Sequence, residues 1–133
     1  MFLAQLEERQ KAAFLVLADT IIRADGAVAH QESAMLAAMK AEMGLSDAVE
    51  PDGRSIGDAV SVFDTRPTKI AAMLELIGLS MADGHVHDRE ASALETLASA
   101  FGLPPVEFEV LRNWVVRQFA LTREAAVLMA GEI

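Results

Sequence analysis

The sequence contains no cysteine, and its 133 residues include no apolar run long enough to span a membrane. The lack of cysteine excludes disulfides, thiolate metal sites and a cysteine nucleophile. A membrane-spanning helix needs about 20 consecutive apolar residues, and charged residues or prolines interrupt each apolar stretch here. The opening residues, "MFLAQLEERQK", carry two glutamates where a signal peptide would need a basic start and an apolar run. We therefore expect a cytoplasmic protein with no direct membrane insertion.

Positive charge is also scarce, because 11 Lys and Arg residues stand against 20 Asp and Glu residues, for a net charge of −9. The basic residues are scattered, whereas binding to nucleic-acid phosphates depends on clustered Lys and Arg. This composition therefore predicts no nucleic-acid binding. The negative net charge favours the binding of cations and of basic protein partners. The same charge is equally explained by a contribution to solubility alone.

Strand patterns are nearly absent, and apolar residues instead recur at the three- and four-residue spacing of amphipathic helices. We therefore predict a single all-α domain over residues 1–133. Prolines and hydroxyl residues mark further helix starts. The predicted helices cover residues 3–24, the regions around 35–43, 70–81 and 94–101, a short segment at 55–63, a proline-opened helix at 105–119, and a last helix with Thr122 as its N-cap.

One acidic pattern occurs twice. "RADGAVAHQE" at residues 23–32 and "MADGHVHDRE" at residues 81–90 both place Val two positions after Asp-Gly and Glu seven positions after the Asp. A shift of 58 residues also aligns a Gly-Leu pair that follows each pattern. The sequence thus predicts two internal repeats, at approximately 3–45 and 61–103, each a helical hairpin with an Asp-Gly corner. Two hairpins packed face to face would give one core and place the corners in comparable positions.

The four acidic residues of the two corners are candidate metal ligands: Asp25, Glu32, Asp83 and Glu90. Their spacing matches the latter part of an EF-hand loop, but the earlier ligand positions hold side chains that cannot donate oxygen to calcium. Neither corner is therefore a complete EF-hand. A cation would have to collect carboxylates from both corners, which is a hard oxygen site suited to calcium, magnesium or manganese.

A purely structural role explains the same four acids. Glycine ends a helix in the left-handed conformation, and the neighbouring aspartate accepts hydrogen bonds in the turn. Glu32 and Glu90 fall at the third position of the next helix, after Ala29 and His87 as N-caps, where each glutamate can complete a capping box. In this interpretation the corners bind nothing.

Histidines lie beside both corners, His30 in the first and His85 and His87 in the second. His85 and His87 are candidate additional metal ligands, and a mixed nitrogen and oxygen site would suit zinc. With a metal-activated water, either could also carry protons in a small hydrolase. Because no motif of a specific reaction is present, we expect a protein that is not an enzyme and has no organic cofactor.

The doubled "ADG" with its later Glu, in an apolar, Ala- and Met-rich helical chain, resembles the TerB-like family, named for a tellurite-resistance protein. The resemblance covers about Leu3 to Phe119. It implies a compact bundle of about seven helices with gathered acidic residues, associated with divalent metal and with stress responses. The family residues carried over are Asp25, Glu32, Asp83 and Glu90, and no catalytic residue comes with them.

A protein-interaction module, as a homodimer or docked on a partner, is the alternative function. Its candidate surface is a helix face that the spacing marks more strongly as core. Additional apolar residues widen that stripe and favour a contact with another chain. The face comprises Phe108, Leu111, Trp114, Val115 and Phe119, and Val110, Val116 and Ala120 widen it.

Overall fold

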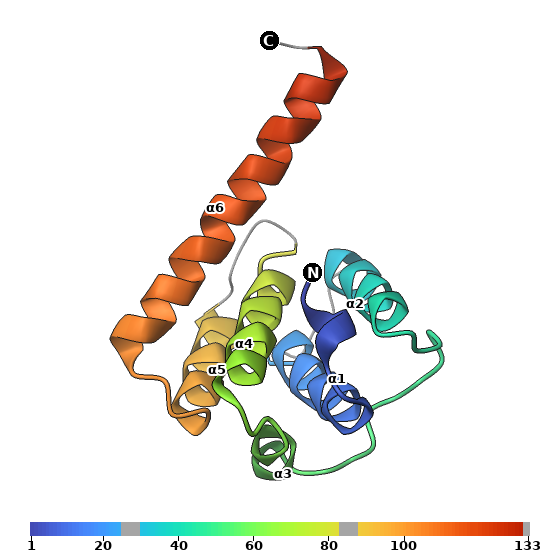
Figure 1. Ribbon diagram of the computed structural model, residues 1–133, viewed down its shortest axis with the longest axis vertical. Coiled ribbons are helices and arrows are strands. Elements are labelled where there is room, and N and C mark those ends of the chain that lie inside the picture. Colours follow the sequence, from blue (N-terminus) through green and yellow to red (C-terminus); the bar gives the residue numbers. More distant parts are fainter. Residues whose placement is uncertain (25–29, 83–87, 132–133) are drawn as a thin grey trace.

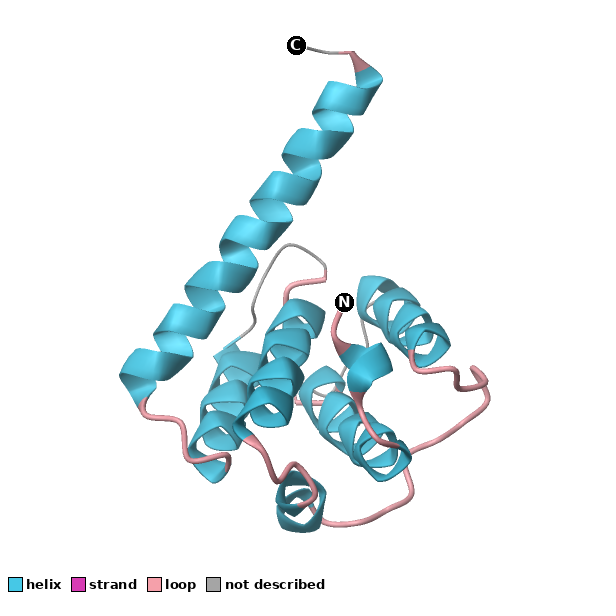
Figure 2. Cartoon of the chain, in the orientation of Figure 1, coloured by secondary structure: helices cyan, strands magenta, loops and turns pink. Residues whose placement is uncertain are grey.

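The computed structural model describes residues 1–24, 30–82 and 88–131. Over these ranges the chain is helical with no strand, so the all-α prediction is confirmed (Figure 2). Six α-helices and one short 3-10 helix come close to the seven helices that the resemblance implies. They are η1 (Leu3–Gln5), α1 (Glu8–Ile22), α2 (His30–Glu42), α3 (Ile56–Ser61), α4 (Arg66–Ser80), α5 (Asp88–Ala100) and α6 (Pro105–Ala130) (Figure 1).

The prediction of one continuous helix over residues 3–24 is wrong in one respect, because the observed helix is interrupted at Leu6. The backbone there is extended, with ψ of 147°, and this lets Leu3 and Leu6 both enter the core. A new helix starts after Glu7, whose amide donates to the Gln10 side chain over 3.1 Å. Glu7 and Gln10 have the spacing of a capping box, so the sequence carried a signal for this second start.

Two helices end in the same backbone arrangement, as the Gly-Leu pairs predict. Gly44 and Gly102 have φ of 75° and 80°, the left-handed region that glycine enters without steric cost. Leu45 and Leu103 then donate to the carbonyls five residues before them, at 2.8 and 2.9 Å. This is the Schellman ending, which satisfies carbonyls that have no partner inside the helix.

The bounds of α1 and α2 match those of α4 and α5 after a shift of 58 residues, at both ends of each helix. The packing follows the same correspondence, since α1 contacts α5 and α4 contacts α2, with α1 and α4 in contact at the centre. The internal repeat itself stays a prediction.

The core lies where α1, α4 and α5 meet, and α3 closes one end of it. Short polar residues start the surrounding helices: the Ser55 hydroxyl accepts from the Asp58 amide at the start of α3, which confirms the short helix predicted at 55–63. The rings of Phe63 and Phe101 meet edge to face, 5.7 Å apart. The largest fully buried side chains include Phe14, Phe63, Leu17, Ile21, Met73, Leu76, Ile77 and Leu97.

The helix predicted at 105–119 and the last helix predicted from Thr122 are in fact one helix, α6. Nothing between Phe119 and Thr122 breaks a helix, and the Thr122 hydroxyl donates to the Gln118 carbonyl over 3.0 Å instead of capping a new start. Only the first part of α6 packs on the bundle, and the rest projects beyond it (Figure 1). Among the described residues, none of the helices, α6 included, is apolar enough over a sufficient length to cross a membrane.

Candidate metal site at the two corners

The two helices that lead into the acidic corners end alike. The Ala24 amide donates to the Ile21 carbonyl, and the Ala82 amide donates to the Leu79 carbonyl, at 3.3 and 3.2 Å. The chain therefore enters both corners through the same tight turn. Four predicted ligands follow these turns and lie outside the described residues: Asp25, Asp83, His85 and His87.

The other two predicted ligands, Glu32 and Glu90, are described, and both are buried. Each is the third residue of the helix that follows its corner, α2 or α5, as the spacing predicts. Glu32 is 2% exposed and Glu90 is 0% exposed, and each has an interaction partner within the chain. Glutamate is among the residues least often fully buried. Two such carboxylates at matching positions are therefore the main electrostatic feature of the corners.

The position of these glutamates at helix starts stabilises only part of a buried negative charge. A helix N-terminus favours a nearby carboxylate by about 0.3–1 kcal/mol, and by about 2 kcal/mol in partly buried positions. Removing a carboxylate from water costs several kcal/mol unless cations or hydrogen-bond donors surround it. An ionised carboxylate at Glu32 or Glu90 would therefore need hydrogen-bond donors or a cation in addition to the helix dipole.

Within the ranges that the structure describes, no cluster of three or more His, Asp or Glu side chains is arranged to hold a metal ion. Each corner contributes one described carboxylate to the predicted site, and the aspartates and histidines of that site lie in the residues not described. The four-carboxylate site thus stays a prediction. The capping-box interpretation does too, since Ala29 and His87 also lie there.

A second charged cluster, which the sequence did not indicate, joins the start of the chain to α2 and α4. The Met1 ammonium lies 2.6 Å from the Glu42 carboxylate and 3.2 Å from that of Glu75. Burial raises the pKa of Glu42, but hydrogen bonds from the Met1 ammonium and the Leu3 amide outweigh it and lower that pKa below its ordinary value. Burial lowers the pKa of the Met1 amino group, but the neighbouring carboxylates of Glu42 and Glu75 have the larger effect. The net result is a raised pKa.

These charges lie beside an apolar groove of about 230 Å³ between α2, α4 and α6. Phe2 and Trp114 meet there with their ring centres 6.1 Å apart. Hydrophobic periodicity could not reveal this groove, because its walls come from four separate segments. The apolar lining residues include Phe2, Met35, Met39, Leu74, Trp114, Val115 and Phe119.

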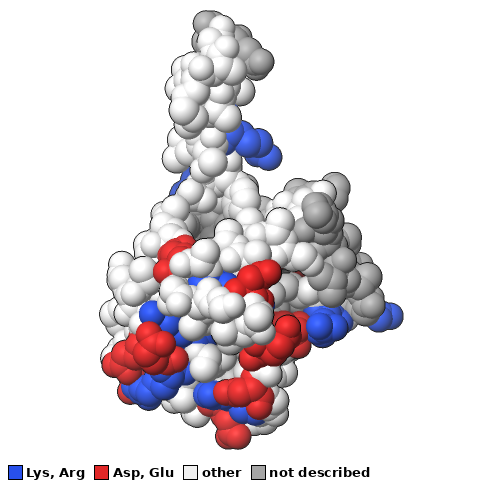
Figure 3. Space-filling model, turned by 90° about the vertical axis from the view of Figure 1, so that its right-hand side faces the viewer, with Lys and Arg blue, Asp and Glu red and all other residues white. Residues whose placement is uncertain are grey.

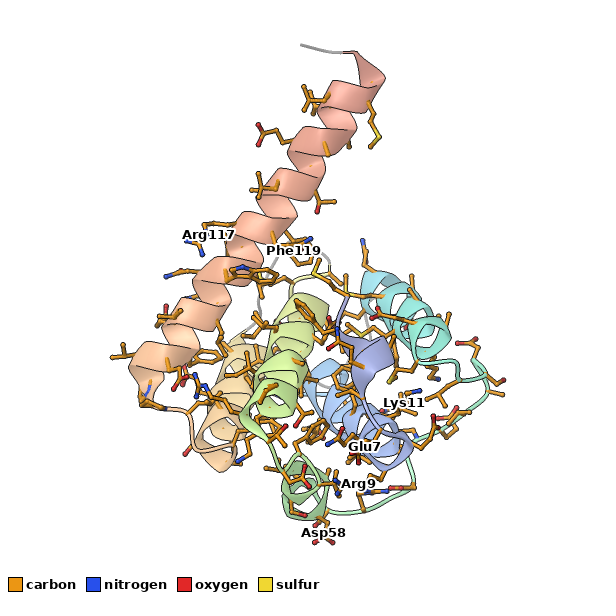
Figure 4. The ribbon with its side chains drawn as sticks, in the orientation of Figure 1. Glu7, Arg9, Lys11, Asp58, Arg117 and Phe119 are labelled. Atoms are coloured by element: carbon orange, nitrogen blue, oxygen red, sulfur yellow. The ribbon has the colours of Figure 1, made fainter. Side chains whose placement is uncertain are left out.

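The predicted core face of α6 is right for Phe108, Leu111 and Val115, which are all buried. Phe119 is partly buried, and Trp114 is 37% exposed. In Figure 4, Phe119 points from α6 toward the bundle and Arg117 points away from it. The same helix thus has a packed side and, at Trp114, an apolar side that meets solvent.

Comparison with protein families gives one match. Residues 54–113 match the family described as Tellurite resistance protein TerB, a stretch that runs from just before α3, through the second corner, into the first turns of α6. No curated protein and no solved structure is similar enough to the chain to count as a match. The matched stretch includes Glu90, one of the two buried glutamates, and leaves the first corner outside it.

Proposed function

We propose that the chain is a TerB-like module, as its match over residues 54–113 supports, and that it binds a divalent cation at its two corners without catalysing a reaction. The proposed ligands are Asp25, Glu32, Asp83 and Glu90. We further propose that the module is cytoplasmic and acts in the response to metal, tellurite or envelope stress.

The burial of Glu32 and Glu90 at matching positions is the observation that carries this proposal. A glutamate that only caps a helix can remain exposed to solvent, so capping alone does not explain the burial of these two side chains. A carboxylate that coordinates a cation is instead commonly enclosed by protein, because the cation offsets the loss of hydration. The same burial at both corners suits one shared role better than two unrelated ones.

The correspondence of the two halves supports a site shared between corners. Helix bounds, turn hydrogen bonds and glycine endings all recur after 58 residues. We infer that residues of approximately 3–45 and 61–103 are structural repeats. A pair of repeats related in this way presents equivalent ligands in pairs, so that each corner supplies half of a coordination sphere.

The ligand chemistry sets the order of metals to be tested. Four carboxylates make a hard oxygen site, which favours calcium, with magnesium and manganese next. Coordination by His85 or His87 would add imidazole nitrogen and shift the preference toward zinc. The rank order of affinities therefore reports whether the histidines belong to the site.

The proposal is tested by thermal unfolding of chelator-treated protein with and without calcium, magnesium, manganese or zinc. A bound ion raises the stability by about 2.7 kcal/mol at a concentration 100 times its Kd. We expect Glu90→Gln and Glu32→Gln each to reduce the shift in Tm caused by the metal, and Asp25→Asn with Asp83→Asn to abolish it. Glu95→Gln is the matched control, because Glu95 is an exposed glutamate on the same helix as Glu90.

The quantity compared is the difference in Tm with and without metal within each variant, so that any effect of the substitution on folding cancels. Unchanged melting curves with all four ions would remove the metal-binding function. A shift that Glu95→Gln reduces as much as Glu90→Gln does would show that the ion binds through general surface charge.

A further inference from the structure

The last part of α6 stands clear of the bundle on all sides. Phe119 is the last partly buried residue of the helix, and every residue from Ala120 to Gly131 is exposed. At 1.5 Å per residue, the helix from Leu121 to Ala130 extends about 15 Å beyond the packed region. We call residues 120–131 the projecting segment.

The projecting segment is apolar for a surface in water. Leu121, Leu128 and Met129 are 64%, 60% and 82% exposed. Its only charged residues are Arg123 and Glu124. In Figure 3, Asp, Glu, Lys and Arg gather over the lower part of the bundle, while the projecting segment carries little colour. A helix of this length that contacts nothing is only marginally stable in water, so burial of its apolar side chains against another surface would be favourable.

Several exposed apolar residues of α6 form one stripe, whereas Val116 and Val127 lie on the other side of the helix. Trp114, Leu121 and Leu128 are spaced by seven residues, which places them on one face of the helix, with Ala125 beside them. Trp114 borders the apolar groove between α2, α4 and α6. The stripe therefore runs from the mouth of the groove to the end of the projecting segment.

We propose that this stripe binds a second copy of the chain, with the two α6 helices antiparallel about a twofold axis at Leu121. The sequence is complementary to itself in this arrangement, because Leu121 meets the partner's Leu121 while Leu128 reaches Trp114 of the partner subunit. The projecting segment of each copy then covers the groove mouth of the other. A symmetric contact of this kind closes as a dimer and does not propagate into a filament.

The charge distribution favours the antiparallel orientation. Each chain has a net charge of −9, but α6 between Val110 and Ala130 carries three arginines and one glutamate, so the acidic excess lies in the bundle. Antiparallel helices hold the two acidic bundles at opposite ends of the contact, whereas parallel helices would bring them side by side. At physiological ionic strength the Debye length is about 8 Å, so the added separation removes most of the repulsion.

The interface is small, which sets its strength. Each copy contributes three large apolar side chains, and at roughly 100 Å² each with the adjoining alanine the pair buries about 700 Å² in total. This area lies below the range of stable specific interfaces. We therefore expect a weak, reversible dimer with a dissociation constant on the order of 100 micromolar. The inference does not depend on metal binding, and the dimer is expected with or without chelator.

Engineered cysteines test the register, because the natural chain has none. Leu121→Cys is expected to give a disulfide-linked dimer under mild oxidation, since the twofold axis places the two thiols together. Leu128→Cys is not expected to do so, because the two Leu128 positions lie about 21 Å apart in this register. Val116→Cys is the control on the opposite, 43%-exposed side of α6, and should stay monomeric. Disulfide formation by both Leu121→Cys and Leu128→Cys would indicate parallel helices and overturn the proposal.

Sedimentation velocity over a concentration series tests the dimer in the full chain without cysteines. Leu121→Glu is expected to raise the dissociation constant about tenfold or more, while Val116→Glu leaves it unchanged. A protein that is monomeric at all concentrations and forms no disulfide through Leu121→Cys would overturn the proposal. Sedimentation of that monomer with phospholipid vesicles would assign the stripe to a membrane surface instead.

Discussion

The two parts of α6 are similar in sequence and opposite in environment. Before Phe119, the helix buries Phe108, Leu111 and Val115 against α4 and α5. After Phe119, residues of the same kind, such as Leu121 and Leu128, are mostly exposed. Leu121 and Leu128 continue the face of Trp114, which lies about a third of a turn from the face of Phe108, Leu111 and Val115. Periodicity therefore identifies the face that prefers contact, whereas the position of the neighbouring helices decides whether contact occurs within one chain.

This comparison is tested most strongly by one substitution made in both parts. Leu111→Ala removes a side chain that is 8% exposed, and Leu121→Ala one that is 64% exposed, from the same helix. We expect the first to lower the free energy of unfolding by about 2–5 kcal/mol, because it leaves a cavity. The second should change it by about 0.5 kcal/mol or less in the monomer. Urea denaturation at low protein concentration measures both, and equal losses would show that the projecting segment is packed.

The glycines on either side of α6 offer a second matched pair. Gly102 and Gly131 have φ of 80° and 71°, and an added Cβ would meet no atom within 4 Å at either place. Alanine is therefore disfavoured at both by backbone conformation alone, by about 1–2 kcal/mol. Gly102→Ala should lower the stability of the whole bundle by that amount, since Gly102 connects two packed helices. Gly131→Ala should only reorganise the end of the helix, and equal shifts in Tm would contradict this.

The boundary between the two parts lies at Phe119, whose Cε2 atom would lie 3.8 Å from a Cβ added at Gly78. That distance is an ordinary van der Waals contact, and Gly78 is inside α4. Gly78→Ala is therefore expected to raise stability by about 0.5–1 kcal/mol, through the higher helix propensity of alanine. A lower Tm in Gly78→Ala would show that Phe119 packs more tightly on α4 than this contact indicates.

The smallest expected effect concerns the charges beside the groove. The lowered pKa of Glu42 means that its contribution to stability is present above the unfolded-state pKa and is lost as pH falls through the folded-state pKa. The raised pKa of the Met1 amino group gives a contribution that is present below its unfolded-state pKa and is lost as pH rises through the raised value.

Glu42→Gln should therefore lower stability at neutral pH and make progressively less difference as the pH falls through the folded-state pKa of Glu42, where the wild-type carboxyl becomes protonated. Because the Met1 amino group is half exposed, we expect a loss of about 1 kcal/mol or less. Denaturation curves of both proteins across this range are the measurement. A loss that is as large in acid as at neutral pH would mean that Glu42 acts through packing.

Much of the fold could be predicted because its signals are local. Gly44, Gly102, Ser55 and Pro105 each determine the backbone of their own turn or helix start, and all act where the sequence indicates. The missed interruption at Leu6 had a local signal too, in the spacing of Glu7 and Gln10. By contrast, the continuity of α6 was missed because threonine can either start a helix or bond back to the preceding turn inside one.

The candidate site was predictable in position but not in environment. The spacing placed Glu32 and Glu90 at the third position of their helices, and the structure agrees. Their burial could not be read from the sequence, because spacing gives a residue's position on its own helix and not what packs around it. The apolar groove was unpredictable for the same reason, since it brings together Phe2, Met35, Leu74 and Trp114 from distant segments.

Contacts between the hairpin of α1 and α2 and the hairpin of α4 and α5 also determine how the protein unfolds. The first helix of each hairpin packs against the second helix of the other hairpin. Neither hairpin therefore forms a complete hydrophobic core alone. Cleavage of the chain in the loop before α3 would give two aggregation-prone, incompletely folded peptides. One of them would contain the residues that match the TerB family. Such peptides should regain structure only when mixed, and amide protons in α1 and α4 should exchange with solvent in a single cooperative event.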